Sequence, residues 1–139
     1  MFTPVSMRSA NTYRTVDLES SVLGANPHQL IGLMFTTLLQ SLTKAKAAIR
    51  SGDTGSKVRT IAHSLRILEE GLKGSLDTHR GGEVANNLVM LYDYCVLRVT
   101  EANLRNNADM IDEVIGLIKP VADGWDAIKG TAEVRLFQG

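Results

Sequence analysis

Residues 82–106 read GEVANNLVMLYDYCVLRVTEANLRN, and this spacing predicts a helix of about seven turns at roughly 3.6 residues per turn. Apolar side chains run almost completely around its axis. One stripe follows steps of three and four residues: Val84, Leu88, Leu91, Cys95, Val99 and Ala102. A second apolar row lies roughly opposite: Met90, Tyr94, Leu97 and Leu104. Such a helix is either the centre of a bundle or has one face that awaits a partner.

An apolar row left in water forgoes a large favourable free energy. Burial of each large side chain is worth about 1.5–3 kcal/mol. A contiguous exposed row of this kind is typical of an interaction site, so the pattern favours a binding protein over an enzyme.

The composition limits the class of protein. At 139 residues the chain suits one domain, and 15 basic residues balance 15 acidic ones, so the electrostatic footprint of a nucleic-acid-binding protein is missing. The lone cysteine, Cys95, allows no internal disulfide and fits a reducing compartment. Neither a membrane-length apolar run nor a signal peptide is recognisable. We therefore expect a cytoplasmic protein with no membrane insertion and no nucleic-acid partner.

Three further helices are predicted around residues 82–106. Asn26 is a good N-cap and Pro27 suits the first helical position, which predicts a helix to about Arg50. A turn at 51–56 precedes a helix that ends near Asp77, with Val58 at the start of its apolar stripe. Asn106 and Asn107 end the helix of residues 82–106 and cap the last helix of the chain. The last helix carries apolar residues from Ile111 to Ile128, and Pro120 should kink it on the solvent side without breaking it.

Four long helices joined by short turns predict an all-α, antiparallel up-down four-helix bundle. We expect the bundle to occupy residues 26–130. Residues 1–25 form an N-terminal segment laid across the bundle, which could include a short helix, and 131–139 form a tail. The ending Leu136–Gly139 resembles part of a viral protease site, so it could come from an expression vector.

Cofactor and metal chemistry is not indicated. His28, His63 and His79 have no partner ligands at helical spacing, and no phosphate-binding loop is present. We therefore expect no cofactor, no metal and no catalytic residue.

One enzyme-like pattern forms an alternative. Residues 62–66, AHSLR, resemble the motif of histidine phosphotransfer domains, which are also four-helix bundles. His63 would accept the phosphoryl group, with Arg66 nearby, but Ile67 stands where those domains usually have glycine. The alternative interpretation of His63 is an ordinary polar surface residue.

The helix predicted to end near Asp77 also carries a row of residues whose side chains together have little bulk. This row includes Ile67, Gly71 and Gly74. A groove lined by these residues and flanked by Met90, Tyr94 and Leu97 could receive a partner helix. Alternatively, the two glycines only permit close packing inside the bundle.

Several blocks, in order, resemble the flagellin-specific export chaperones of the FliS family over nearly the whole chain. They are residues 25–31 (ANPHQLI), 71–72 (GL), 81–83 (GGE), 87–88 (NL), 91–94 (LYDY) and 102–104 (ANL), with Trp125 at the place of a frequent last-helix tryptophan. The sequence departs at 35–38 (FTTL), where relatives commonly have an aromatic residue followed by Asp-Gly-Ala.

This resemblance implies a cytosolic helical-bundle chaperone without ATPase activity. Its implied partners are the disordered C-terminal region of flagellin, a component of the flagellar export gate and other flagellar regulators. Binding would prevent premature polymerisation and assist delivery to the export apparatus. The resemblance also implies that the N-terminal segment covers part of the client surface beforehand.

Our hypothesis for the partner-binding residues combines the apolar row, the row of small residues and the N-terminal cover. The set is Tyr13, Ile67, Gly71, Gly74, Met90, Tyr94, Leu97 and Leu104. A remaining alternative is a self-associating structural bundle, in which two copies form a homodimer over the extra apolar face.

Overall fold

The computed structural model describes Gly24 and residues 26–128. Most of the predicted N-terminal segment 1–25, with Tyr13, and all of the tail 131–139 lie outside this range. In the described part the elements are α2 (Pro27–Ser51), α3 (Thr54–Arg66), the π-helical segment η1 (Ile67–Leu72), the 3₁₀ segment η2 (Lys73–Ser75), α4 (Thr78–Arg105) and α5 (Ala108–Ala127), with no strand. The all-α prediction is confirmed.

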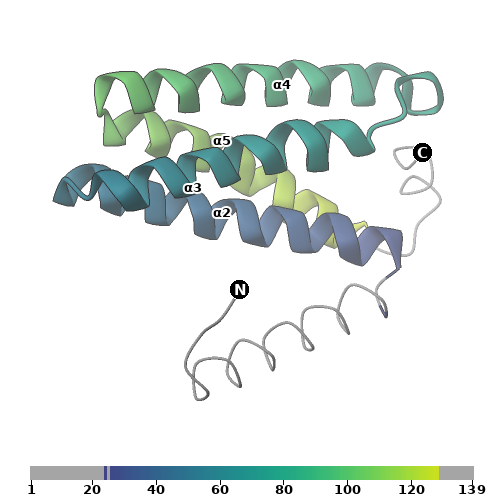
Figure 1. The fold of residues 1–139 in the computed structure, drawn as a ribbon. Coiled ribbons are helices and arrows are strands. Elements are labelled where there is room, and N and C mark those ends of the chain that lie inside the picture. Colours follow the sequence, from purple (N-terminus) through teal and green to yellow (C-terminus); the bar gives the residue numbers. More distant parts are fainter. Residues whose placement is uncertain (1–23, 25, 129–139) are drawn as a thin grey trace.

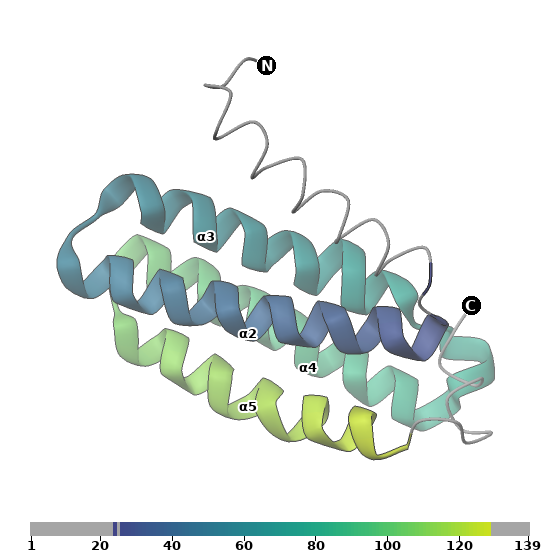
Figure 2. The same ribbon diagram turned by 90° about the horizontal axis from the view of Figure 1, so that it is seen from below.

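The four long helices lie side by side and alternate in direction along the chain (Figures 1 and 2). Helix α2 packs against α3 and α5, and α4 packs against the same two helices from the other side. The up-down bundle is therefore confirmed. Helix α4 is not its centre, because among the described elements it packs against α3, η1, η2 and α5 and leaves its other side open.

Side-chain caps fix where the helices begin. Asn26 accepts from the Gln29 amide while the Gln29 side chain accepts from the Asn26 amide, a reciprocal capping box that agrees with the predicted start at Pro27. Asp53 caps α3, and Asn107 caps α5. Asn106 adopts a left-handed conformation at the end of α4, as expected for a helix stop.

The core is formed by one face of each helix. Its fully buried side chains of large volume include Leu38, Leu42, Leu68, Leu72, Val99, Ile111, Val114 and Ile118. The inner face of α4 contributes Ala85, Tyr92, Cys95, Val99 and Ala102, so most of its predicted stripe is buried or half-buried. Val84 is an exception, because it is 53% exposed and its neighbour Ala85 faces the core.

Helix α3 departs from the prediction at Val58, which is 54% exposed although it was expected to begin the apolar stripe, whereas Ser64 is fully buried. A buried hydroxyl is tolerated because it is hydrogen-bonded: Ser64 Oγ lies 2.8 Å from Ser41 Oγ and 2.8 Å from the Thr60 carbonyl oxygen. The polar pair thus occupies a core position that hydrophobicity alone would not assign.

The helix predicted to end near Asp77 ends at Ser75, but it is not a regular α-helix throughout. After Arg66 it widens into the π-helical η1 and then tightens into the 3₁₀ segment η2. Helix α5 continues through the exposed Pro120, so the predicted absence of a break is confirmed.

Candidate functional site: an apolar strip and a neighbouring groove

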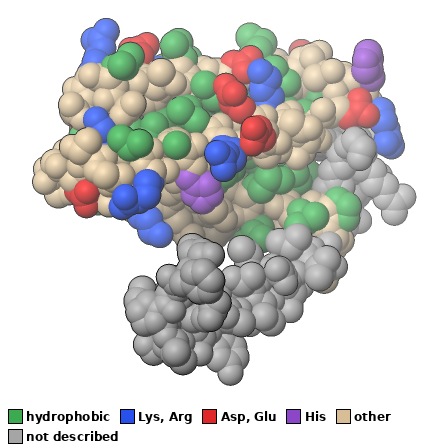
Figure 3. Space-filling model, in the orientation of Figure 1, with side chains coloured by type: hydrophobic (Ala, Val, Ile, Leu, Met, Phe, Trp, Pro, Cys, Tyr) green, Lys and Arg blue, Asp and Glu red, His purple; other side chains and the backbone are tan. Residues whose placement is uncertain are grey.

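The outward face of α4 carries a row of large exposed apolar side chains. The exposed fractions are 69% for Met90, 42% for Tyr94, 55% for Leu97 and 76% for Leu104. We call these four residues the α4 strip. Their separations of four, three and seven residues place them along one side of the helix. Hydrophobic side chains are visible over α4 among charged ones in Figure 3.

A charged network borders the strip on the α5 side. Tyr94 Oη donates to Glu113 Oε2 at 2.5 Å, and Arg98 Nε donates to Glu113 Oε1 at 2.7 Å. These two hydrogen bonds lower the pKa of Glu113, and the bond to Glu113 raises the pKa of Tyr94. Arg98 also pairs with Glu101 at 3.4 Å. The phenol ring of Tyr94 is therefore held by its hydroxyl while the ring itself stays accessible.

An ion pair lies beside the strip on the opposite side. Lys73 Nζ of η2 lies 2.7 Å from Asp93 Oδ1 of α4, and this hydrogen bond raises the pKa of Lys73. Because Asp93 is adjacent to Tyr94, the strip has charged borders and an apolar middle. That arrangement is typical of binding surfaces, whose rims are polar.

The row of small residues does not face the α4 strip as we expected. Ile67 is only 9% exposed and belongs to the hydrophobic core. A Cβ added at Gly71 would lie 2.6 Å from Met34 Sδ, so Gly71 is packed closely against α2. For these two residues the structure agrees with the alternative interpretation, in which small size permits internal packing.

Gly74 lies on another surface, together with residues of α2. An apolar hollow of about 380 Å³ is lined by Pro27, Leu30, Ile31, Met34, Gly74, Ser75 and Leu76. We call it the α2–η2 groove. None of its lining residues comes from α4. The sequence-predicted single groove is thus replaced by two separate features, the α4 strip and this groove.

This side of α2 was not among the predicted partner-binding residues. Pro27, Leu30 and Met34 are spaced three and four residues apart on that helix. In the structure Ile31 and Phe35 face the core, and Leu30 and Met34 are half-buried. The available signal was an apolar stripe too wide for one buried face.

The interior carries no reactive group in the described region. Burial raises the pKa of Cys95 to about 11, so its thiol stays protonated at neutral pH. His63 is exposed, and no group of three His, Cys, Asp or Glu side chains within residues 26–128 is placed to hold a metal ion. None of the described helices is both long and apolar enough to cross a membrane.

Comparison with known proteins gives one consistent result. Residues 9–132 match the family model described as flagellar protein FliS. The flagellar secretion chaperone FliS of Salmonella typhimurium is 41% identical over 123 residues, covering 88% of this chain and 91% of the relative. FliSB of Pseudomonas aeruginosa is 38% identical, covering 88% of this chain and 97% of its own length. FliS of Bacillus subtilis is 29% identical over 134 residues, or 96% of this chain and 98% of the relative.

Proposed function

Because the chain belongs to the FliS family of flagellar secretion chaperones, we propose that it binds the disordered C-terminal region of flagellin in the cytoplasm. Binding keeps the subunit from polymerising before export and assists its delivery to a component of the flagellar export gate. The family consists of chaperones and not of enzymes, as the sequence predicted. This argues against phosphotransfer through His63.

The observation that carries this proposal is the α4 strip. Four large apolar side chains stand in water on one helix face, and three of them are more than half exposed. Burial of each would contribute roughly 1.5–3 kcal/mol to a complex. An amphipathic client segment with apolar residues at spacings of three and four would cover the strip in the helix-in-groove mode.

A disordered client fits this surface for a physical reason. Such a segment becomes ordered only as it binds, so part of the favourable burial is offset by lost conformational entropy. A large contact area then gives moderate affinity, which suits a chaperone that must release its client at export.

Calorimetry with the C-terminal region of flagellin from the same organism tests the proposal. The unmodified protein should bind with a negative heat-capacity change, the marker of apolar burial. A Tyr94→Asp, Leu97→Asp variant should lose binding while circular dichroism shows unchanged helicity. Val58→Asp is the matched control, because Val58 is 54% exposed on α3, outside the strip. Unchanged affinity in the double variant would refute this placement of the client.

Light scattering distinguishes the homodimer alternative. A chaperone should form a complex with flagellin, whereas a structural bundle would form a stable dimer over the α4 strip and ignore flagellin. The part of Tyr13 in a movable N-terminal cover stays a prediction.

A further inference from the structure

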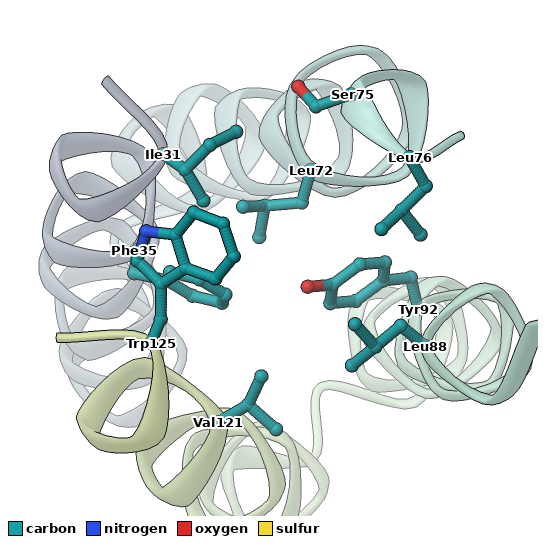
Figure 4. Close-up of a pocket in the computed structure, with 9 residues that line it drawn as sticks. All are labelled: Ile31, Phe35, Leu72, Ser75, Leu76, Leu88, Tyr92, Val121 and Trp125. Carbon is teal, nitrogen blue, oxygen red and sulfur yellow. The ribbon is translucent and has the colours of Figure 1, made fainter. Parts of the chain in front are cut away.

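A small cavity lies at the end of the core where the start of α2, the end of α5 and η2 meet. Its volume is about 30 Å³. Side chains from α2, η1, η2, the turn after η2, α4 and α5 surround it in Figure 4: Ile31, Phe35, Leu72, Ser75, Leu76, Leu88, Tyr92, Val121 and Trp125. The lining is almost wholly apolar, with one hydroxyl directed inward.

That inward group is the hydroxyl of Tyr92. The residue is only 2% exposed, and its oxygen points toward the middle of the cavity in Figure 4. Across residues 26–128 no hydrogen-bond partner is found for it. Buried polar groups are nearly always paired, because an unpaired one loses its hydration without compensation. A buried, unpaired hydroxyl in a cavity therefore points to an occupant.

Water alone is a poor occupant of this cavity. A buried water molecule usually makes two to four hydrogen bonds. The other hydroxyl of the lining, Ser75 Oγ, donates to the Gly71 carbonyl at 2.5 Å and points away from Tyr92 in Figure 4. The surroundings instead suit a group with an apolar body and one hydrogen-bonding atom.

The cavity adjoins the α2–η2 groove, since Ile31, Ser75 and Leu76 line both. Among the described residues, no charged side chain lines either one. Two other hollows do carry charge, with Asp123 and Asp126 in one and Lys44 and Arg59 in the other. An occupant of the groove and cavity should therefore be uncharged. Among peptide segments, this favours one made of apolar and small neutral polar residues.

We propose that the α2–η2 groove and the cavity together bind an uncharged, apolar segment of the client, with one small polar side chain hydrogen-bonded to Tyr92. This inference rests on the proposed function and adds a second contact surface to the α4 strip. A volume of about 30 Å³ holds roughly two water-sized groups. It fits the tip of Ser, Thr or Asn and is too small for an aromatic ring.

Tyr92→Phe tests this directly, because it removes the hydroxyl and keeps the ring. The free protein should become more stable by about 2–4 °C in Tm, since an unpaired buried group is lost. Affinity for the flagellin C-terminal region should fall about fivefold, the loss of one neutral hydrogen bond. These opposite signs distinguish a binding role from a structural one. A lower Tm, or unchanged affinity, would overturn the inference.

Gly74→Leu gives an independent test by filling the groove. A Cβ at Gly74 meets only the Glu69 carbonyl oxygen, at 3.5 Å, so the variant should fold. We expect at least tenfold weaker flagellin binding, whereas Val58→Ser on α3 should bind normally. If Leu97→Asp weakens binding but Tyr92→Phe and Gly74→Leu do not, only the groove is excluded. If the unmodified protein does not bind flagellin, the proposed function fails and this inference with it.

Discussion

His28 and Trp125 hold each other through two reciprocal hydrogen bonds across 97 positions of sequence. Nε2 of His28 donates to the Trp125 carbonyl oxygen at 2.6 Å, and Nε1 of Trp125 donates to the His28 carbonyl oxygen at 3.0 Å. The rings stack with centroids 4.9 Å apart and an angle of 15° between their planes. Both residues are 9% exposed. This pair ties the first turn of α2 to the last turn of α5, beside the cavity of Tyr92.

Loss of this pair should destabilise the whole bundle. We expect His28→Ala to lower the free energy of unfolding by about 2 kcal/mol, because the short hydrogen bond from the imidazole to the Trp125 carbonyl oxygen and the stacked ring are both removed. Urea denaturation followed by circular dichroism measures the change. His63→Ala, at an exposed histidine, is the matched control and should stay within about 0.5 kcal/mol. Equal stability of the two variants would contradict a structural role for the pair.

The pair also shows what the sequence could and could not predict. The capping role of Asn26 and Pro27 follows from local chemistry, and so do the stops at Asn106 and Asn107, so helix bounds were predictable. The contact between His28 and Trp125 depends on how α2 and α5 pack, which no local pattern encodes. His28 therefore looked like a residue without partners.

One part of the candidate site was predictable from the sequence, and another part was not. The α4 strip was predictable because four apolar residues fall on one side of a helix whose other side already fills a core. The sides of Ile67 and Gly71 were not predictable, since the π-helical segment η1 changes the angle per residue just where they lie. The unpaired hydroxyl of Tyr92 depends on side chains from α2, η2 and α5, and only the structure brings them together.

Glu113 should make stability depend on acid pH. Its folded-state pKa is lowered by the hydrogen bonds from Tyr94 and Arg98, so its contribution is present above the unfolded-state pKa and is lost as the pH falls through the folded-state pKa. Glu113→Gln should therefore be less stable than the parent protein at pH 7, and the difference should shrink as the pH approaches 3. Thermal melts at stepped pH measure it. Glu83→Gln, at an exposed residue that forms no ion pair within residues 26–128, should show no such dependence.

The buried thiol of Cys95 should report opening of the core. The side chain is 0% exposed and its pKa is raised to about 11 by burial, so alkylation at pH 8 should be slow in the folded state. The rate should rise steeply through the urea transition. Val58→Cys in a Cys95→Ala background provides an exposed thiol that should react at once. Rapid labelling of native Cys95 would mean that α4 separates from the bundle without global unfolding.

Two glycines in helices should respond in opposite directions to the same substitution. Gly116 lies within α5, and a Cβ there meets nothing within 4 Å, so Gly116→Ala should stabilise the protein by about 0.5–1 kcal/mol through helix propensity. Gly82 also has open space, but its φ is 58° and its ψ is −135°, a conformation that side chains disfavour.

Gly82→Ala should therefore destabilise the protein by about 1–3 kcal/mol, although no atom blocks the new methyl group. Chemical denaturation of the two variants in parallel separates backbone strain from packing. The interruption at Gly82 separates the first turn of α4, which Asp77 caps, from the part of the helix that packs into the core from Ala85 onward. The strain should therefore act on that first turn, and flagellin affinity should remain unchanged in both variants, because the α4 strip begins at Met90. A Gly82→Ala variant as stable as the parent protein would show that α4 tolerates a regular first turn.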